Sequence, residues 1–252
     1  MNEFESEWFA NEAFWRETYP FMFPEKRVAA ATGEVEQIIA LSECAGGRVL
    51  DLACGPGRHS IAFARRGFAV TGVDRSPFLL EHARVRAREN DADIEWVQSD
   101  MRAFRRSSSF DLAVCLFTSF GFFRDDADNR RVLENVATSL RPGGVFVLDL
   151  LGKEILAKVF TPTSSHEMAD ALMVSRRRAV EDWSRMENEW LVIRDGASRT
   201  FPFSHWIYSA REIKEMFLSA GFADVCAYGD YSGAPYGPEA TRLVILGRTD
   251  PR

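Results

Sequence analysis

The chain has 252 residues, of which 46% are hydrophobic and 27% charged, which is ordinary for a globular protein that buries a large core. A formal net charge of -6 argues against a broad nucleic-acid footprint, and no apolar run has the length of a membrane span. The acidic start of the chain, Met1–Glu5, is not typical of a signal peptide.

Residues 28–150 alternate between helical patterns and apolar runs, which predicts a parallel sheet covered by helices on both faces. Ser76 and Pro77 provide an N-cap and a first-turn proline, and the Arg-Pro-Gly-Gly of residues 141–144 ends another helix. Ligands of such sheets bind at the carboxyl ends of the strands. The expected strands are 48–54, 68–74, 94–100, 110–117 and 145–150, and the expected helices are 28–43, 58–66, one that begins at Pro77, and 126–140.

The pattern changes after Leu151. Three β-rich runs with polar interruptions lie between residues 171 and 208, and Asp195-Gly196 separates the last two of them, which predicts a small antiparallel insertion. A helix at 210–220 and strands at 223–229 and 242–247 are expected to follow. The three β-rich runs are 171–180, 190–193 and 201–208.

The most informative segment is the glycine loop after the first predicted strand. Gly55 and Gly57 have no Cβ atom, so they let the backbone approach a ligand closely. However, Asp51 precedes the glycines, and Ser60 occupies the place of the third glycine in a dinucleotide fingerprint. A carboxylate roughly 5 Å from a phosphate charge costs about 3 kcal/mol at an effective dielectric of about 20. The loop therefore favours a nucleoside that carries positive charge and no phosphate.

Three aspartates end or nearly end predicted strands, and we expect them to line one edge of the sheet. Asp51 follows this rule in the first strand, Asp74 in the second and Asp100 in the third. A carboxylate after the second strand can accept two hydrogen bonds from a ribose diol. Asp100 could accept one from an adenine amino group while Met101 packs against the ring. The alternative for each aspartate is an N-cap or a turn.

Four ordered segments resemble the signatures of class I S-adenosylmethionine-dependent methyltransferases of the small-molecule type. They are Asp51–Gly57, Gly72–Ser76, Ser99–Met101 and Leu140–Gly144, and their order and spacing cover residues 48–150. The resemblance implies an α/β, Rossmann-like fold with a mainly parallel seven-stranded sheet, helices on both faces and a small antiparallel β insertion after the fifth strand. We expect one domain over 1–252, with an aromatic N-terminal lid at 1–27, a cofactor-binding core at 28–150, an insertion that forms a substrate lid at 160–208, and a C-terminal helix with the last two strands at 209–252.

The resemblance also implies where S-adenosylmethionine binds. Gly55 and Gly57 would approach its methionine part, and Asp51 would face its ammonium group directly or through water. Asp74 would hold the ribose hydroxyls, while Asp100 and Met101 flank the adenine. Arg58 and His59 follow the loop and have surface roles as their alternatives. The full set of implied cofactor contacts is Asp51, Ala53, Cys54, Gly55, Gly57, Arg58, His59, Asp74, Arg75, Ser99, Asp100, Met101, Leu116 and Phe117.

The implied reaction is an in-line displacement that moves the methyl group to a small-molecule acceptor and releases S-adenosyl-L-homocysteine. The protein would align the reactants, exclude water and remove a proton if one must leave. The sequence identifies neither the acceptor atom nor the pathway. Two alternatives stay open: a protein that binds S-adenosylmethionine for other chemistry or for none, and an NAD-dependent Rossmann oxidoreductase, which Asp51 disfavours.

Aromatic residues indicate where the acceptor binds. The segment after the fourth strand, 117–123, has no Asn-Pro-Pro-Tyr-like amide clamp, and its phenylalanines suit a hydrophobic or flat small molecule. The alternative for Phe122 and Phe123 is packing against the next helix. The aromatic segment 15–23, together with Ser204-His205-Trp206, would contribute to a lid, and docking on the core is the alternative for segment 15–23. The expected substrate contacts are Tyr19, Phe120, Phe122, Phe123 and Trp206.

His205 and Tyr19 are the candidate proton acceptors, because a histidine pKa lies near neutral pH. A structural role is the alternative for both. Asp149, at the end of the fifth strand, either contacts substrate or caps a helix. The four cysteines and four histidines are scattered, which predicts reduced thiols, no metal site and a cytoplasmic protein. We expect no nucleic-acid or membrane partner, and the oligomeric state stays open.

Overall fold

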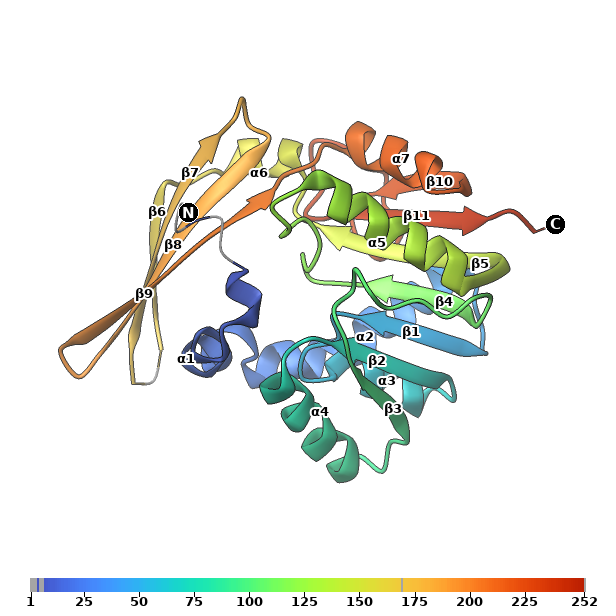
Figure 1. Ribbon diagram of the computed structural model, residues 1–252, viewed down its shortest axis with the longest axis horizontal. Coiled ribbons are helices and arrows are strands. Elements are labelled where there is room, and N and C mark those ends of the chain that lie inside the picture. Colours follow the sequence, from blue (N-terminus) through green and yellow to red (C-terminus); the bar gives the residue numbers. More distant parts are fainter. Residues whose placement is uncertain (1–3, 5–6, 169, 252) are drawn as a thin grey trace.

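A seven-stranded sheet runs through the computed structural model, which describes residue 4, residues 7–168 and residues 170–251 (Figure 1). The acidic start considered above and the first part of the expected lid fall largely on residues 1–3, 5 and 6, outside the described residues. β11 is antiparallel to both neighbours, and the other pairs are parallel. The strand order is β10 (Phe222–Tyr228), β11 (Leu243–Thr249), β5 (Leu140–Leu150), β4 (Phe110–Cys115), β1 (Arg48–Leu52), β2 (Ala69–Asp74) and β3 (Ile94–Gln98).

This order places a topological switch point between β1 and β4. From β1 the chain proceeds outward to β2 and β3, and it then returns to the other side of β1 as β4. The connections on the two sides of this point diverge, which leaves a crevice at the carboxyl ends of the strands. β5 begins at Leu140 instead of the expected residue 145, because Leu140 already pairs with Phe110; pairing then shifts and resumes between Leu112 and Val145.

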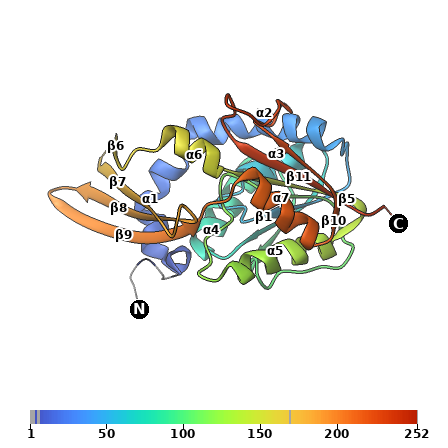
Figure 2. The ribbon, with the colours of Figure 1, turned by 90° about the horizontal axis from the view of Figure 1, so that it is seen from above.

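Helices cover both faces of the sheet, as the alternating pattern predicts (Figure 2). α2 (Glu25–Ser42) and α3 (Arg58–Arg65) lie on one face, and α5 (Asp126–Ser139) and α7 (Ala210–Ser219) lie on the other. α4 (Pro77–Glu89) packs beside β2 and β3, and the Ser76 hydroxyl caps it by accepting from the Leu79 amide. Alternate residues of β1 supply the two cores: Val49 points to α2 and α3, whereas Leu50 and Leu52 point to the opposite face.

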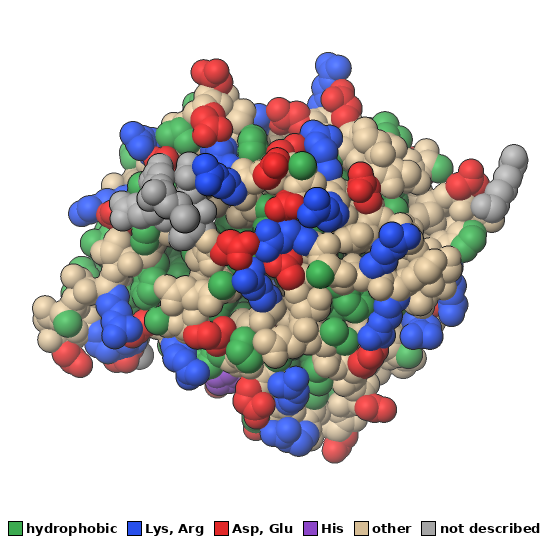
Figure 3. Space-filling model, viewed as in Figure 1, with side chains coloured by type: hydrophobic (Ala, Val, Ile, Leu, Met, Phe, Trp, Pro, Cys, Tyr) green, Lys and Arg blue, Asp and Glu red, His purple; other side chains and the backbone are tan. Residues whose placement is uncertain are grey.

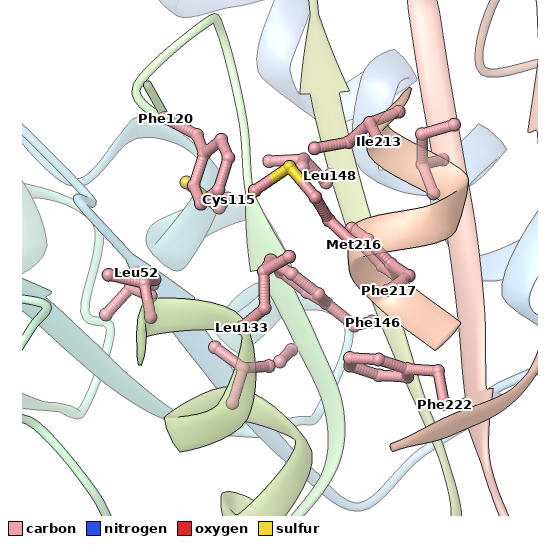
Figure 4. Packing of buried hydrophobic residues seen from close by; sticks show 14 of the residues in the cluster. Leu52, Cys115, Phe120, Leu133, Phe146, Leu148, Ile213, Met216, Phe217 and Phe222 are labelled. Atoms are coloured by element: carbon pink, nitrogen blue, oxygen red, sulfur yellow. The ribbon is translucent and has the colours of Figure 1, made fainter. Parts of the chain in front are cut away.

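The larger core joins α5 and α7 to the sheet through aromatic side chains (Figure 4). Phe146 of β5 stacks on Phe217 of α7 with ring centroids 5.3 Å apart, and Phe222 packs beside both rings. All three are buried, and each contributes roughly 2–3 kcal/mol to the free energy of unfolding by burial. This packing fixes β5, which carries Asp149, and β11, which begins directly after Arg242; both residues are described below.

The residues between β5 and α7 form a separate antiparallel sheet, and the predicted insertion is confirmed. α6 (Lys153–Val159) precedes it and was not expected. Asp195 and Gly196, both with positive φ, form the turn between the last two strands. β6 escaped prediction because Thr163–Glu167 is polar and exposed on both faces. The strand order is β6 (Thr163–Glu167), β7 (Leu172–Val180), β8 (Arg185–Arg194) and β9 (Ala197–Trp206).

The N-terminal segment packs between this small sheet and α4 (Figure 1). A short 3-10 helix, η2 (Trp8–Ala10), precedes α1 (Glu12–Met22). Phe14 of α1 is buried against Phe201 and Phe203 of β9, in a third hydrophobic cluster. The aromatic N-terminal segment and the insertion therefore share one core.

The face in Figure 3 intersperses acidic and basic side chains. None of the helices in the described ranges is long and apolar enough to cross a membrane. All four cysteines are free thiols, and no group of three or more metal-binding side chains occurs among the described residues.

Candidate functional site

A cavity with about 1050 Å³ of empty space, part of it open to solvent, lies at the carboxyl ends of β1, β2, β3 and β4. The crevice predicted by the strand order is therefore hollow, and α1 and η2 contribute to its walls. The cavity is lined by Phe9, Trp15, Met22, Phe23, Ala53, Cys54, Gly55, Arg58, His59, Val73, Asp74, Arg75, Leu79, Ser99, Asp100, Met101, Leu116, Phe117, Thr118, Ser119, Phe122 and Phe123.

The glycine loop between β1 and α3 forms one wall. Gly57 is the N-cap of α3 with φ 78°, a left-handed conformation that favours glycine. A Cβ atom on Gly57 would lie 2.6 Å from Trp96 and 3.1 Å from Ala83, so the residue also permits close packing. Gly57 itself does not line the cavity, whereas Cys54 and Gly55 do. The glycines thus shape the loop, and its first half faces the cavity.

Asp74, at the end of β2, ties this loop to the next strand. Its two carboxylate oxygens accept hydrogen bonds from the backbone amides of Gly55, at 2.8 Å, and Ser76, at 2.9 Å. Burial raises the pKa of Asp74 to about 6, and the charge of Asp51 adds to the shift although the amide bonds oppose it. Each carboxylate oxygen accepts more than one hydrogen bond, so Asp74 can still receive hydroxyl donors from the cavity.

Asp100, after β3, belongs to a cluster of ion pairs at the edge of the cavity. Arg102 donates to both of its carboxylate oxygens, and Arg75 donates to one of them at 3.1 Å. Glu7 accepts from both arginines and so fastens the N-terminal segment to this edge. Although burial opposes the shift, the bonds from Arg102 lower the pKa of Asp100, which keeps it charged.

Asp51 lies behind the glycine loop and does not line the cavity. It is buried, and its carboxylate accepts a hydrogen bond of 2.5 Å from the Ser60 hydroxyl of α3. Burial raises the pKa of Asp51, and neighbouring His59 and Arg58 oppose the shift. Its effect on the cavity is therefore electrostatic, across one layer of backbone.

The first turn of α3 brings Arg58 and His59 to the cavity, where both side chains are buried. Glu34 of α2 accepts from Arg58 Nη1, and the same oxygen lies 2.8 Å from His59 Nε2. Burial alone would raise the pKa of Glu34, but the bond to His59 and the charge of Arg58 lower it to about 2. Arg58 Nη2 is buried and has no hydrogen-bond partner among the described residues.

The backbone after β4 is strained where it meets the cavity. Phe117 and Thr118 both have positive φ, at 63° and 61°, which is costly for residues other than glycine and most of all for a β-branched one. Such strain persists only where the surroundings enforce it. Asp149 of β5 supplies this constraint: its carboxylate accepts from the Phe117 amide at 2.8 Å, and its carbonyl accepts from the Thr118 amide at 3.0 Å.

Two more side chains complete this support, both from the loop between β10 and β11. Arg242 donates to the Asp149 carboxylate at 2.6 Å and to the Thr118 hydroxyl at 3.0 Å. The Tyr231 hydroxyl donates to the same carboxylate at 2.6 Å. Asp149 is fully buried. Asp149 was expected either to contact substrate or to cap a helix, and both expectations differ from its observed position. It contacts the Phe117–Thr118 loop that lines the cavity, and it does not line the cavity itself.

The N-terminal segment forms part of the cavity wall. Phe9, Trp15 and Phe23 line it, and the Trp15 indole donates to the Phe9 carbonyl at 2.9 Å. Glu12 of α1 accepts from the Ser76 hydroxyl and from the Phe78 amide, so α1 is attached to the start of α4. These contacts hold α1 against the start of α4, beside the cavity.

The structure does not bring His205 or Tyr19 to the cavity wall. His205 packs against Phe122, and its Nδ1 lies 3.2 Å from the Asn188 side-chain amide. Burial, with Arg185 nearby, lowers the pKa of His205 to about 4, which favours neutral imidazole. Tyr19 stacks on His82 of α4 with ring centroids 4.3 Å apart, and its hydroxyl has no partner among the described residues.

Of the five expected substrate contacts, Phe122 and Phe123 line the cavity. Phe120 is instead buried in the main core, and the Trp206 indole donates to the Phe123 carbonyl at 3.0 Å from outside the wall. Phe120 therefore packs in the core and does not line the cavity.

Twelve of the residues expected to contact cofactor line the cavity, and Asp51 and Gly57 lie behind them. Sequence reasoning missed eight lining residues. Three of the eight fall in the aromatic segment 15–23 that was suspected as a lid, and two directly follow Phe117, an expected cofactor contact. Their closeness in sequence to these predicted positions could have identified them as lining residues. The eight are Phe9, Trp15, Met22, Phe23, Val73, Leu79, Thr118 and Ser119.

Comparison with known proteins adds to this geometry. Residues 49–144 match a family model described as a methyltransferase domain. The chain is 36% identical over 115 residues to the glycine N-methyltransferase of Rattus norvegicus, which is 40% of this chain and 39% of the rat protein. The chain thus spans about two fifths of that relative's length.

Two further proteins match along most of their length. The glycine/sarcosine N-methyltransferase of Aphanothece halophytica is 27% identical over 234 residues, covering 88% of this chain and 84% of the relative. An S-adenosylmethionine-dependent methyltransferase from Clostridium acetobutylicum ATCC 824 superposes with a TM-score of 0.78 at 17% identity, over 95% of this chain and 98% of that structure. The structural likeness concerns the fold.

Proposed function

We propose that this chain is a class I S-adenosylmethionine-dependent methyltransferase, which transfers a methyl group from S-adenosylmethionine to a small-molecule acceptor and releases S-adenosyl-L-homocysteine. The observation that carries the proposal is the placement of Asp74, Asp100 and the Gly55 loop around one cavity at the switch point. These groups offer the acceptors and the close backbone approach that a phosphate-free nucleoside requires.

Each part of the cofactor has a proposed contact. The Asp74 carboxylate accepts from the ribose hydroxyls, next to the amide of Gly55 that it already holds. Met101 packs against the adenine, and Asp100, kept charged by Arg102, faces its amino group. The methionine part follows the loop from Ala53 toward Arg58. Asp51 acts on it only through its negative field, because a layer of backbone separates them.

When bound, S-adenosylmethionine supplies a methyl group on a positively charged sulfur, which leaves as a neutral thioether. The protein's own residues align and enclose the reactants. Phe9, Trp15 and Phe23 cover the cavity and exclude water, and the strained turn at Phe117 and Thr118 presents a rigid wall. Positioning and exclusion of water supply much of the rate enhancement in such displacements.

We propose that the acceptor enters on the side of Phe122 and Phe123, beneath the lid formed by the N-terminal segment and the four-stranded sheet. The names of two relatives make glycine and sarcosine the first acceptors to test. An acceptor nitrogen would attack with its lone pair and then lose a proton to solvent. We assign no proton transfer to His205 or Tyr19, because neither lines the cavity.

Two measurements test the proposal. Calorimetry compares binding of S-adenosyl-L-homocysteine with binding of NAD, and tight binding of NAD alone would refute the assignment. Incubation with methyl-labelled S-adenosylmethionine and a panel of small amines, beginning with glycine and sarcosine, then asks which acceptor gains label. Binding of cofactor with no labelled product from any small-molecule extract would refute methyl transfer.

A further inference from the structure

The turn after β4 borders both reactants of the proposed reaction. Residues 116–119 line the cavity one after another. They lead from the end of β4, which lies beside β1 and its glycine loop, toward Phe122, on whose side the acceptor is proposed to enter. A change in the shape of this turn would therefore move atoms on both sides of the methyl group that is transferred.

A buried carboxylate outside the cavity holds this turn. Three hydrogen bonds reach the Asp149 carboxylate: one from the Phe117 amide at 2.8 Å, and two from the loop between β10 and β11, given by the Tyr231 hydroxyl and Arg242 Nε, both at 2.6 Å. Burial, with the charge of Asp149 beside it, raises the pKa of Tyr231, so its hydroxyl stays protonated and donates. A buried ion pair often stabilises a fold no more than apolar side chains of the same volume. These bonds therefore indicate a role in placing the turn.

The turn needs this support because its backbone is strained. Phe117 and Thr118 adopt left-handed conformations one after the other, with φ of 63° and 61°. Arg242 joins the support to the second of them, since its Nη2 donates to the Thr118 hydroxyl at 3.0 Å while its Nε donates to Asp149. If these bonds were lost, the turn could relax to an unstrained form and change the cavity wall.

We propose that Asp149, with its donors Tyr231 and Arg242, is a positioning residue for methyl transfer. It holds the Phe117–Thr118 turn in its left-handed form, and the turn in that form aligns the acceptor with the cofactor. The inference rests on the proposed function. A displacement of about 1 Å in an active site can lower a rate about 100-fold, so a relaxed turn should lower kcat. The nucleoside is proposed to bind groups after β2 and β3, and its affinity should not follow the turn.

Tyr231→Phe is the main variant, because it removes one donor to Asp149 and keeps the buried ring. Asp149→Asn removes the charge itself and should have a larger effect in the same direction, at the risk of unfolding a fully buried site. Tyr236→Phe is the matched control. Tyr236 lies in the same loop, but its hydroxyl donates to Glu154 at 2.9 Å and not to Asp149.

Hydrogen exchange measured by mass spectrometry reports on the turn without any acceptor. The amides of Phe117 and Thr118 both donate to Asp149, at 2.8 and 3.0 Å, so the peptide that contains them should exchange slowly in wild type and in Tyr236→Phe. In Tyr231→Phe we expect exchange roughly tenfold faster or more, the usual effect of losing a charge-assisted hydrogen bond.

Methyl transfer from labelled S-adenosylmethionine, at saturating cofactor, tests the consequence for turnover. The probe acceptor is the amine of the panel that wild type labels fastest, or the small-molecule extract itself if no amine gains label. In Tyr231→Phe we expect kcat to fall roughly 10- to 100-fold, while the Kd of the nucleoside 5′-methylthioadenosine changes less than about twofold. Tyr236→Phe should leave both values unchanged.

Thr118→Gly provides a rescue that a merely structural role would not show. Glycine adopts the left-handed form without steric cost, so the turn depends less on its support in this background, and adding Tyr231→Phe should lower kcat less than about threefold. The comparison is made between Thr118→Gly and the double variant, so any effect of Thr118→Gly itself cancels.

Three results would each overturn the inference: equal exchange of the turn in wild type and Tyr231→Phe, an unchanged kcat despite faster exchange, or a parallel loss of kcat and nucleoside affinity without rescue. In all three, methyl transfer by wild type still supports the proposed function. Failure of wild type to label any acceptor, in the panel or in the extract, refutes the proposed function and the inference with it.

Discussion

Protonation of Asp74 should weaken nucleoside binding as the pH falls below neutrality. The charged carboxylate is the form that accepts hydrogen bonds from ribose hydroxyls, and burial raises the pKa of Asp74 to about 6. Binding therefore has its full strength above this pKa and weakens as the pH drops through it. At pH 5 about ten of every eleven Asp74 side chains are protonated, which weakens binding about tenfold, or about 1.4 kcal/mol.

The assay is calorimetry with 5′-methylthioadenosine between pH 5 and pH 8, because this ligand has no carboxylate and no aliphatic amine. We expect a flat affinity above pH 7 and about a tenfold loss at pH 5. Near-ultraviolet circular dichroism at each pH shows whether the protein stays folded.

Asp74→Asn is the control, because it removes the titrating group. At pH 7 it should bind the nucleoside about 1.5–3 kcal/mol more weakly than wild type, the usual worth of charge-assisted hydrogen bonds. Its affinity should then change little with pH, and any dependence that remains belongs to other groups of the cavity. A wild-type affinity that is constant from pH 5 to pH 8 would refute the assignment of Asp74 to the ribose.

Three more perturbations test separate parts of the structure. Gly57→Ala should lower the free energy of unfolding by about 1–3 kcal/mol, because the added Cβ would lie 2.6 Å from Trp96. Gly33→Ala is the control, since it lies in an open position of α2, and it should raise the free energy of unfolding by about 0.5–1 kcal/mol. Thermal unfolding that shows the same sign of change for both variants would contradict this packing. Glu7→Gln removes the ion pairs of Glu7 with Arg75 and Arg102, so stopped-flow measurement should show faster dissociation of S-adenosyl-L-homocysteine, and an unchanged rate would mean that these two pairs do not hold the lid. His205→Ala should lower kcat by less than about tenfold, since the imidazole lies behind the cavity wall, and a loss of about 100-fold or more with unchanged cofactor affinity would restore it as a general base.

The core of the fold was predictable because local signals and tertiary structure agree there. The segments 48–54, 68–74 and 110–117 are apolar runs bounded by turn residues, and each forms a strand within two residues of the expected limits. The same agreement explains why Asp74 and Asp100 were predicted to lie at the edge of the sheet. Once the limits of a strand are known, the residue at its end is placed at that edge.

The remaining parts depend on contacts that no local pattern reveals. α1 contains Pro20, and its segment was predicted only to be aromatic, not helical. The helix depends on tertiary contacts, in which Phe14 packs on β9. Asp51 follows the strand rule, but a hydrogen bond from Ser60 turns its carboxylate away from the cavity. Arg58 was found from its neighbours in sequence, whereas its partner Glu34 lies 24 residues earlier and gave no signal.

The bond from Arg242 to Thr118 has a consequence for synthesis of the protein. These residues are 124 positions apart, so the turn leaves the ribosome long before the guanidinium that holds it is made. A nascent chain that already contains the glycine loop and Asp149 would still lack the side chain that holds the Thr118 hydroxyl. We therefore expect ribosome-bound chains that stop before residue 242 to capture cofactor poorly, which delays occupancy until translation has passed Arg242.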